Sequence, residues 1–525
     1  MKSTWLLTVA VIFVSACPIS AWGAFTVSGQ VSPINPATWT SSTTGYIGRV
    51  LNRPGRLTVD GGSDLLSYLG YLGYDSASGG WVTVIGAGST WTNSTSLYVG
   101  NFGTGTLAVQ NGGMISNTVG YLGYASGSSG TATVTGAGST WTNSSSLRIG
   151  DSGTGTLAVQ NGGMISNTVG YLGYASGSSG TATVTGAGST WTSSSSLIVG
   201  NSGTGILTVA DGGKVTATSV SISSPSTVNL RVGGSGMLVL GSASTTGSIS
   251  NSGKINLYAD AFLAAGTYSP ITEYAARTMT WSGTGTCNAT GGAWDSTAKT
   301  FTVAEATALA AGATHSVSAG GRLLITDSAS GKRVGASFAG VPGGTTFSAS
   351  LLSVSELSGL ALVADGPVLS AWYTNFTGGE VLLSFDIGLG ISDLEIWYSG
   401  GGPLWNPYAP SDMIYDSHGI TSFTVTGFNR YAVTGMVAGD ANNDGVVDAA
   451  DYIALKQNFG LGSDATRPQG DLNKDGAVNW ADLQILMSNF GTRTLPTLAP
   501  TATPEPATLG LLAIGVLAII RHKRK

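Results

Sequence analysis

Gly120-Tyr-Leu-Gly-Tyr124, Val134-Thr-Gly-Ala-Gly-Ser-Thr-Trp-Thr142 and Gly155-Thr-Leu-Ala-Val-Gln-Asn-Gly-Gly163 belong to a segment that repeats every 50 residues. Residues 70–119 and 120–169 are identical at 39 of 50 positions. Apolar residues alternate with small or polar ones, as in Leu157-Ala-Val159, which is the period of a strand with one buried face. The Asn-Gly-Gly sequences supply tight turns. The repeat therefore predicts short strands joined by glycine turns.

Each repeat divides into comparable halves of 27 and 23 residues, so the strands return at a nearly constant spacing. Regular spacing of this kind is typical of a β-solenoid, in which each coil buries its apolar edge against the next. We expect the solenoid over residues 45–222 and an N-terminal cap over 24–44. A C-terminal cap is expected over 223–268, because an open coil would leave strand edges unpaired.

The last two segments quoted above, Val134–Thr142 and Gly155–Gly163, together with Ser146-Leu-Arg-Ile-Gly150, resemble the repeat shared by type V secretion (autotransporter-like) proteins and PEP-CTERM proteins. The resemblance covers about a third of the chain. It implies a surface-exposed β-helix and no particular activity.

The composition restricts the class of protein. Charged residues make up 9% of the 525 residues, against roughly 25% in ordinary soluble domains, and glycine accounts for 80 residues. A net charge of −5 excludes nucleic acid as the partner, because nucleic-acid binding requires a basic surface. Glycine and β-branched residues favour many turns and short strands. The chain is therefore expected to be mainly β and extracellular.

Residues 269–436 lose the repeat but keep the strand pattern. Val381-Leu-Leu-Ser-Phe-Asp-Ile387, Leu394-Glu-Ile-Trp-Tyr398 and Phe423-Thr-Val-Thr-Gly-Phe428 are separated by Gly, Pro and Asn turns. We expect a β-sandwich here.

Two acidic loops follow, and they carry the most specific chemistry of the chain. They read Asp440-Ala-Asn-Asn-Asp-Gly-Val-Val-Asp-Ala-Ala-Asp451 and Asp471-Leu-Asn-Lys-Asp-Gly-Ala-Val-Asn-Trp-Ala-Asp482. Each has oxygen-bearing side chains at positions 1, 3, 5, 9 and 12 and glycine at position 6. Ca²⁺ requires such a ring of oxygens and a sharp turn at the glycine.

A short helix is expected after each loop. Tyr452, Leu455 and Phe459 share one helix face, and the matching residues after the second loop are Leu483, Leu486 and Phe490. Position 12 is Asp where an EF-hand has Glu, and no helix precedes the first loop. In these respects residues 439–491 resemble a type I dockerin, and we take 437–491 as the domain.

The resemblance implies two Ca²⁺ sites, with no other cofactor. The first site would use Asp440, Asn442, Asp444, Asp448, Asp451 and the carbonyl of Val446. The second would use Asp471, Asn473, Asp475, Asn479, Asp482 and the carbonyl of Ala477. Four carboxylates in the first loop against three in the second predict that the first site is tighter.

Dockerins bind cohesins through loop positions 10 and 11 and the adjacent helix faces. Here those positions are Ala449-Ala450 and Trp480-Ala481, where dockerins of cellulosomes often carry a hydroxyl pair. This departure argues against a cellulosome-type partner and for a cohesin-like or other surface protein. Trp480 is a candidate contact anchor, with core packing as its alternative role.

The N-terminus predicts export. Lys2 precedes an apolar run over residues 5–16, and Ala21 and Gly23 precede the expected cleavage site, which gives a signal peptide over 1–23. Cys17 leaves lipoprotein processing open as an alternative. Cys287 then has no cysteine partner, so no disulfide is expected.

The C-terminus predicts sorting at the cell envelope. A Pro/Thr-rich linker over residues 492–503 leads to Pro504, Glu505 and Pro506, an apolar run over 507–520 and a basic end. Residues 504–525 resemble the PEP-CTERM sorting signal, which implies recognition by an exosortase. The 14-residue run spans about 21 Å as a helix against about 30 Å of hydrocarbon, so it is a short membrane helix and a marginal anchor. The protein is thus expected in the cell envelope or extracellular matrix, transiently or permanently anchored.

No catalytic set emerges from the sequence. His315 and His418 are isolated, and the solenoid lacks the clustered acids that polysaccharide lyases and hydrolases need. Two carbohydrate-binding alternatives remain open. One is a sugar-stacking ladder formed by Trp91, Trp141 and Trp191, although structural packing is the favoured role of these residues. The other is a glycan or cation site in the sandwich near Trp397, with candidate residues Asp386, Asp393, Glu395, Trp405, Tyr408, Asp412 and Asp416.

The favoured hypothesis is a non-enzymatic surface or matrix protein that is structural or adhesive, binds calcium and docks partners through the dockerin. The alternative is a component of extracellular polysaccharide degradation, and a third hypothesis is a passive carbohydrate-binding module. If the chain is an enzyme at all, we expect a polysaccharide hydrolase or lyase.

Overall fold

The computed structural model describes residues 24–233, 237–274, 278–341, 344–357, 359–360, 366–376, 379–401, 404–410, 412–427, 430–461, 465–473 and 476–492. The expected signal peptide, membrane helix and sorting residues Pro504, Glu505 and Pro506 lie outside these ranges. So does Asp475. The described residues form two compact units: 24–182 together with 188–205, and 183–187 together with those between 206 and 492.

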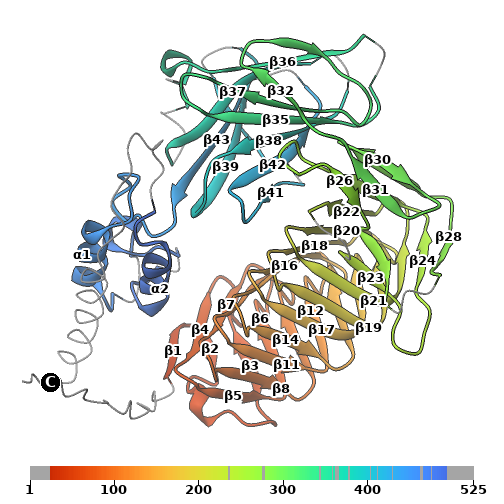
Figure 1. Ribbon diagram of the computed structural model, residues 1–525. Coiled ribbons are helices and arrows are strands. Elements are labelled where there is room, and N and C mark those ends of the chain that lie inside the picture. Colours follow the sequence, from red (N-terminus) through yellow and green to blue (C-terminus); the bar gives the residue numbers. More distant parts are fainter. Residues whose placement is uncertain are drawn as a thin grey trace, which may run out of the picture. The chain divides into compact units, whose positions relative to one another are not determined.

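The expected β-solenoid is present, built from two long sheets (Figure 1). One sheet takes a single strand from each coil. Its strands, in order, are β1 (Ala24–Gly29), β4 (Gly55–Asp60), β7 (Gly79–Ile85), β10 (Thr104–Gln110), β13 (Ser129–Thr135), β16 (Thr154–Gln160), β18 (Ser179–Thr185), β20 (Thr204–Ala210), β22 (Thr227–Arg231), β25 (Lys254–Tyr258) and β29 (Thr286–Thr290).

The second sheet usually takes two short strands from each coil. They are β2 (Val31–Ser32), β3 (Thr44–Ile47), β5 (Asp64–Ser67), β6 (Leu69–Leu72), β8 (Thr90–Asn93), β9 (Ser96–Val99), β11 (Met114–Asn117), β12 (Val119–Leu122), β14 (Thr140–Asn143), β15 (Ser146–Ile149), β17 (Met164–Leu172), β19 (Thr190–Val199), β21 (Lys214–Ile222), β23 (Leu238–Leu240), β24 (Ser248–Asn251), β27 (Ile271–Glu273) and β28 (Thr280–Ser282). A 3-10 helix, η1 (Pro36–Thr38), lies between β2 and β3.

The register explains the unequal halves of the repeat. In the first sheet Gly79 pairs with Thr104 and Thr104 with Ser129, so the coils of the repeat advance by 25 residues. In the second sheet Tyr71 pairs with Tyr98, which is 27 residues later, and Tyr98 with Tyr121, which is 23 residues later. The 27-residue and 23-residue halves of the repeat are therefore visible in the register of the second sheet, whereas the first sheet keeps a constant step.

The Asn-Gly-Gly turns behave as the sequence predicts. Asn111 and Gly112 both have positive φ angles, of 51° and 91°. A Cβ atom on Gly113 would lie 2.3 Å from the carbonyl oxygen of Val84 in a neighbouring coil. Only glycine permits this approach, so the turn fixes the distance between coils.

The three repeat tryptophans are core residues. Trp91, Trp141 and Trp191 are each 0% exposed. The indole N–H of Trp141 donates to Asn117 Oδ1 at 2.7 Å, and Asn117 Nδ2 donates to Asn143 Oδ1 at 2.6 Å. Because no indole face reaches the surface, the tryptophan sugar ladder considered above is wrong.

A ladder of tyrosines lies on the outer face of the same sheet, on neighbouring strands. Tyr46, Tyr71, Tyr98 and Tyr121 stack successively, with ring centroids 5.3, 4.8 and 4.7 Å apart. Arg148 occupies the next register position, between Tyr121 and Tyr171. Its guanidinium lies 4.0 Å from the ring centroid of Tyr174. The ring faces are covered by one another, so the ladder is suited to stabilising the coils rather than to stacking on a ligand.

The parallel pairing continues beyond the expected end of the solenoid. Strand β22 pairs in parallel with β20 and β25, and β25 pairs in parallel with β29, which ends at Thr290. Residues 223–268 therefore form further coils where a cap was expected. The boundary was missed because these coils keep the strand alternation but not the 50-residue repeat. A small sheet of β26 (Gly266–Tyr268), β31 (Thr300–Val303) and β30 (Ala293–Asp295) follows.

The expected β-sandwich consists of two six-stranded sheets whose inner faces share one apolar core. One sheet has the order β32 (Thr307–Ala310), β34 (Arg322–Thr326), β35 (Arg333–Phe338), β38 (Val381–Asp386), β42 (Ile420–Val425) and β41 (Ile414–Tyr415). The other has β33 (Thr314–Ser316), β36 (Thr346–Leu351), β37 (Val368–Phe376), β43 (Arg430–Val437), β39 (Ile391–Ser399) and β40 (Asn406–Tyr408), with a short 3-10 helix, η2 (Val354–Leu357), after β36.

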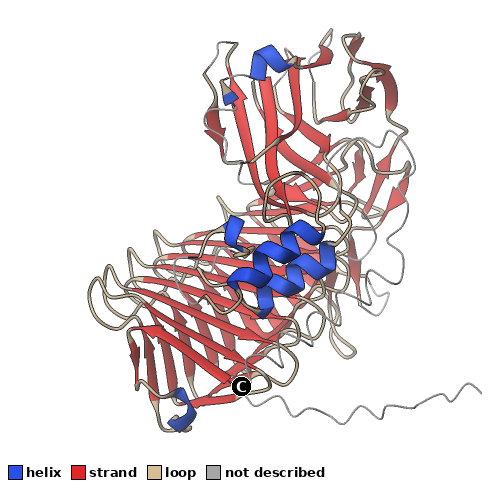
Figure 2. Ribbon diagram, turned by 90° about the vertical axis from the view of Figure 1, so that its left-hand side faces the viewer, coloured by secondary structure: helices blue, strands red, loops and turns tan. Residues whose placement is uncertain are grey.

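Two α-helices follow the sandwich and contact each other, α1 (Ala449–Asn458) and α2 (Trp480–Asn489) (Figure 2). A 3-10 helix, η4 (Arg467–Gln469), lies between them. Leu455 and Leu486, one from each helix, are both 0% exposed. The expected loop–helix duplication is therefore present.

Candidate metal-binding and docking site

The last residues of the first acidic loop form the start of α1. Asp448 is the N-cap, and its Oδ1 accepts the backbone N–H of Ala450 at 2.7 Å. Asp451 completes a capping box by accepting the N–H of Asp448 at 2.8 Å. Asn443 and Gly445 have φ angles of 59° and 85°, which makes the turn in the middle of the loop. The carboxylates thus belong to a rigid turn followed by a capped helix.

The last aspartate of each loop is buried and holds the start of its loop. Asp451 and Asp482 are both 0% exposed. Asp451 Oδ1 accepts N–H groups from Ala441 and Asn442 at 2.7 and 3.1 Å. Asp482 Oδ1 accepts the equivalent groups of Leu472 and Asn473 at 2.8 and 3.2 Å. The two loops therefore close in the same way.

The first aspartate of each loop is buried as well. Asp440 and Asp471 are 1% and 2% exposed, and each accepts the N–H of the position-6 glycine, Gly445 at 2.8 Å and Gly476 at 2.9 Å. Burial raises the pKa of Asp440, and nearby Asp451 adds to the rise, whereas the N–H of Gly445 opposes it. The loop therefore concentrates negative charge in a buried position, where the charged form is unfavourable unless a cation compensates it.

Arg467, in η4 between the two halves, contacts the start of the first loop. Its Nε donates to the carbonyl oxygen of Asp440 at 2.9 Å, and its Nη2 donates to that of Val437 at 2.7 Å. Its Nη1 lies 3.4 Å from Asp393 Oδ2 on β39. Burial lowers the pKa of Arg467, and Asp393 and Asp440 are the leading opposing influences. Sequence reasoning missed this residue, because nothing in a lone arginine of a linker marks its target.

The donor set fits calcium, since the predicted ligands are carboxylates, amides and carbonyls, the hard oxygen donors that Ca²⁺ prefers. In the first loop Asn442, Asp444 and Asp448 accompany the two buried aspartates. Across the described ranges, no three His, Cys, Asp or Glu side chains are gathered closely enough to hold one ion. In the second loop, Asp475 lies outside those ranges.

The surface beside the loops is partly apolar. Ala449 and Ala450 are exposed, as are Ile453 of α1 at 51% and Met487 of α2 at 37%. Tyr452 and Leu455 point inward instead, with exposures of 8% and 0%. The side chain of Trp480 is outside the described part, so its proposed contact role stays a prediction.

The acidic residues singled out in the sandwich do not form one site. Asp386 pairs with Arg333, and Asp416 accepts backbone N–H groups of His418 and Ile420. Trp397 and Trp405 are 7% and 6% exposed and belong to a small apolar cluster. The remaining acids, Asp393, Glu395 and Asp412, contact Arg467, Thr434 and Arg231 respectively. Of the whole group, Tyr408 and Asp412 line the same pocket.

His315 lies on β33, and His418 lies 3.9 Å from Asp416 Oδ2 with its side chain 79% exposed. No helix in the described ranges is both long and apolar enough to cross a membrane.

Comparison with known families agrees with the two modules at the C-terminal end. Residues 438–491 match the Dockerin type I domain, and residues 502–525 match the PEP-CTERM protein-sorting motif. No curated protein and no solved structure gave a significant match. Type I dockerin domains bind calcium and cohesin-type partners, and the PEP-CTERM motif implies exosortase processing. These modules indicate an exported, surface-sorted protein that docks partners.

Proposed function

We propose that this chain, with its dockerin domain and sorting motif, is a calcium-dependent assembly protein of the cell surface. Its solenoid and sandwich form a structural ectodomain, and the dockerin joins that ectodomain to a surface partner. The observation that carries the proposal is the duplicated loop, in which the first and last aspartates are at most 2% exposed in both copies. Such buried carboxylates require positive charge nearby.

Two Ca²⁺ ions are proposed, one for each loop. The first is held by Asp440, Asn442, Asp444, Asp448, Asp451 and the carbonyl of Val446. The second is held by Asp471, Asn473, Asp475, Asn479, Asp482 and the carbonyl of Ala477. When bound, the ions supply charge compensation, and the residues of the chain supply the loop closure and helix caps described above.

Calcium titration of the full chain by calorimetry tests this assignment. We expect two binding events, and a single remaining event in both Asp440→Asn and Asp471→Asn. A calcium concentration 100 times the dissociation constant would stabilise the module by about 2.7 kcal/mol per site. Asp64→Asn, on a solenoid strand, is the matched control and should keep both events. A wild-type chain without saturable calcium binding would rule out the assignment.

Partner docking is proposed on the exposed face that includes Ala449, Ala450, Ile453 and Met487. The apolar character of this face, in place of a hydroxyl pair, favours a partner with an apolar patch. Surface plasmon resonance against a panel of recombinant cohesins would measure docking directly. Ile453→Asp should weaken capture at least tenfold, whereas Ile34→Asp, at a 78% exposed isoleucine before β3, should leave it unchanged. Equal loss in both variants would count against this face.

We further propose that the tail anchors the protein until an exosortase processes it. The proposal rests on the sorting motif at residues 502–525. Mass spectrometry of the protein from exporting cells would reveal the mature end. A tail that stays intact in cells with an active exosortase would contradict it.

A further inference from the structure

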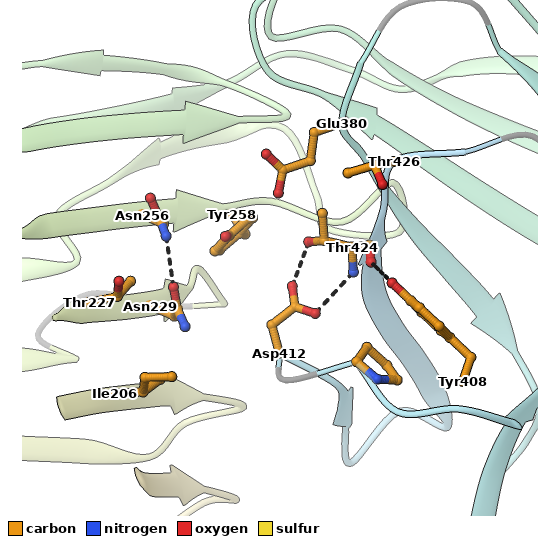
Figure 3. Close-up of a pocket in the computed structure, with 11 residues that line it drawn as sticks. Ile206, Thr227, Asn229, Asn256, Tyr258, Glu380, Tyr408, Asp412, Thr424 and Thr426 are labelled. Carbon is orange, nitrogen blue, oxygen red and sulfur yellow. Dashed lines mark hydrogen bonds between the residues drawn. The ribbon is translucent and has the colours of Figure 1, made fainter. Parts of the chain in front are cut away.

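A polar pocket of about 280 Å³ lies within the second unit, between the last solenoid coils and the sandwich strands (Figure 3). One wall comes from β20, β22 and β25 and carries Asn229, Asn256 and Tyr258. The other comes from residues 380–426 and carries Glu380, Tyr408 and Asp412. The volume is close to the lower end of the range for small-molecule sites, about 300–1,000 Å³.

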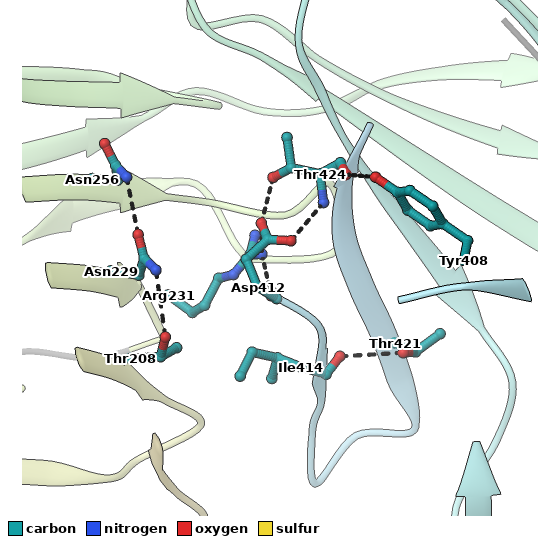
Figure 4. A network of polar contacts seen from close by, with 9 residues as sticks. All are labelled: Thr208, Asn229, Arg231, Asn256, Tyr408, Asp412, Ile414, Thr421 and Thr424. Atoms are coloured by element: carbon teal, nitrogen blue, oxygen red, sulfur yellow. Dashed lines mark hydrogen bonds and ion pairs between the residues drawn. The ribbon is translucent and has the colours of Figure 1, made fainter. Parts of the chain in front are cut away.

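The solenoid wall is a ladder of amides with fixed orientation. Asn288 Nδ2 donates to Asn256 Oδ1 at 2.8 Å, and Asn256 Nδ2 donates to Asn229 Oδ1 at 2.9 Å. Asn229 Nδ2 in turn lies 3.4 Å from Thr208 Oγ1 (Figure 4). Because each amide is held by its neighbour, the remaining donor and acceptor positions of Asn229 and Asn256 are preorganised.

The sandwich wall is held by an ion pair behind it. Arg231 Nη2 donates to Asp412 Oδ2 and to the Asp412 carbonyl oxygen, both at 2.8 Å. Asp412 Oδ1 also accepts the N–H of Thr424 at 3.1 Å, and Tyr408 donates its hydroxyl to the Thr424 carbonyl at 3.0 Å. These contacts fix the carboxylate and the phenol at the pocket wall (Figures 3 and 4).

Arg231 has unused hydrogen-bonding capacity. The residue is 7% exposed, and its Nε and Nη1 atoms are buried without a hydrogen-bond partner. Its guanidinium lies 4.3 Å from the ring centroid of Tyr258, a pocket residue. Buried N–H groups normally find an acceptor, so a buried water is expected beside this arginine, which supports the pocket wall without lining it.

The charges of the pocket select the class of ligand. Glu380 and Asp412 line it, while Arg231 is already paired with Asp412, so an anion would meet uncompensated negative charge. A metal ion is disfavoured because the pocket is lined by two carboxylates, Glu380 and Asp412, and Asp412 is already paired with Arg231. Carboxylates, amides, hydroxyls and two tyrosines are instead suited to a molecule with many O–H groups and small apolar faces.

We propose that this pocket binds one or two residues of an uncharged glycan. Glu380 and Asp412 accept sugar hydroxyls, Asn229 and Asn256 donate and accept, and Tyr258 and Tyr408 contact the C–H faces. The site is independent of the dockerin and of calcium, so it gives the ectodomain a ligand of its own.

Calorimetry and ligand-observed NMR with neutral tetrasaccharides of glucose, mannose, xylose and N-acetylglucosamine test the proposal on the full chain. We expect saturable binding of at least one, at least tenfold weaker in Asn256→Ala and in Glu380→Gln. The matched control Glu305→Gln, at an exposed glutamate outside the pocket, should bind as the wild type does.

Three results would overturn the proposal. They are absence of saturable binding at millimolar sugar, equal binding by the pocket variants, and tighter binding of a galacturonate tetrasaccharide than of any neutral one. Adding a chelator separates this site from the proposed function, because sugar binding should persist when the dockerin loses its calcium.

Discussion

Replacing Arg148 by tyrosine should destabilise the solenoid, although it would complete the tyrosine ladder. The equivalent residues of the preceding repeat are Tyr98 and Asn101, whereas Arg148 accompanies Asp151. Arg148 Nη1 lies 2.9 Å from Asp151 Oδ1, and the two side chains are 26% and 9% exposed. In Arg148→Tyr, the Asp151 carboxylate would stay buried without its cation.

The magnitude follows from these exposures. Removing one partner of a fully buried ion pair leaves the other charge uncompensated and lowers the free energy of unfolding by about 3–5 kcal/mol. Because Arg148 is partly solvated, the expected loss here is about 1–3 kcal/mol. Adding Asp151→Asn removes the charge and restores the Tyr–Asn combination of the preceding repeat. The new ring stack then contributes about 0.5–1.5 kcal/mol. The double variant should therefore be at least as stable as the wild type.

Hydrogen exchange of the full chain, measured by mass spectrometry on peptides covering β15 and β16, would detect the difference. A loss of about 1.4 kcal/mol corresponds to tenfold faster exchange where the segment opens locally. Ile198→Tyr is the matched control, because Ile198 is the residue equivalent to Arg148 in the following repeat, where it pairs with Tyr171 and already accompanies Asn201. If the double variant exchanges as fast as the single one, the charge argument fails.

Three further predictions follow from other sites. Asn117→Ala removes the acceptor of the Trp141 N–H and the donor to Asn143, so it should lower the free energy of unfolding by about 2–4 kcal/mol. The loss should appear as faster hydrogen exchange over β11 and β14, whereas the control Ser116→Ala, on the outer face, should change exchange little. Burial raises the pKa of the Cys287 thiol to about 11, whereas in denaturant the pKa is about 8.5, so alkylation at pH 8 should be about 10²-fold slower in the folded chain. Because the unfolded thiol ionises first, this thiol lowers the stability of the folded chain as pH rises from about 8.5 to 11. Equal alkylation rates in the folded and denatured chains would refute the raised pKa. Arg467→Met removes the N–H groups that bind the carbonyls of Val437 and Asp440, so exchange over residues 437–445 should become faster by a factor of about ten; the exposed Lys456→Met is the control, and equal effects of both would contradict the assigned contacts.

The repeat and the duplicated acidic loops could be predicted because their signals are local and occur more than once. Alternation such as Leu157-Ala-Val159 determines which side chains face inward, and glycine at position 6 of each loop determines the turn. The predicted C-terminal end of the solenoid differs from the observed one, because the prediction relied on the repeat. Residues 223–290 keep the alternation but lose the repeat, and only strand pairing shows that β22, β25 and β29 continue the coils.

Side-chain roles that depend on direction were less predictable. The recurrence of Trp141 favoured structural packing but left a surface ladder open, and burial decided for the core. Tyr408 and Asp412 were candidates from sequence, but Asn229, Asn256 and Glu380 were not, because they lie far apart along the chain.

By itself, the sequence determined the strand period, the turns, the duplicated acidic loops and the signals for export and sorting, because each of these depends on residues close together in the chain. Only the tertiary structure decided which coils extend the solenoid, where Arg467 binds, and which asparagines face Asp412 across a pocket. Those features depend on contacts between segments distant in sequence, and no local pattern specifies the partner of a long-range contact.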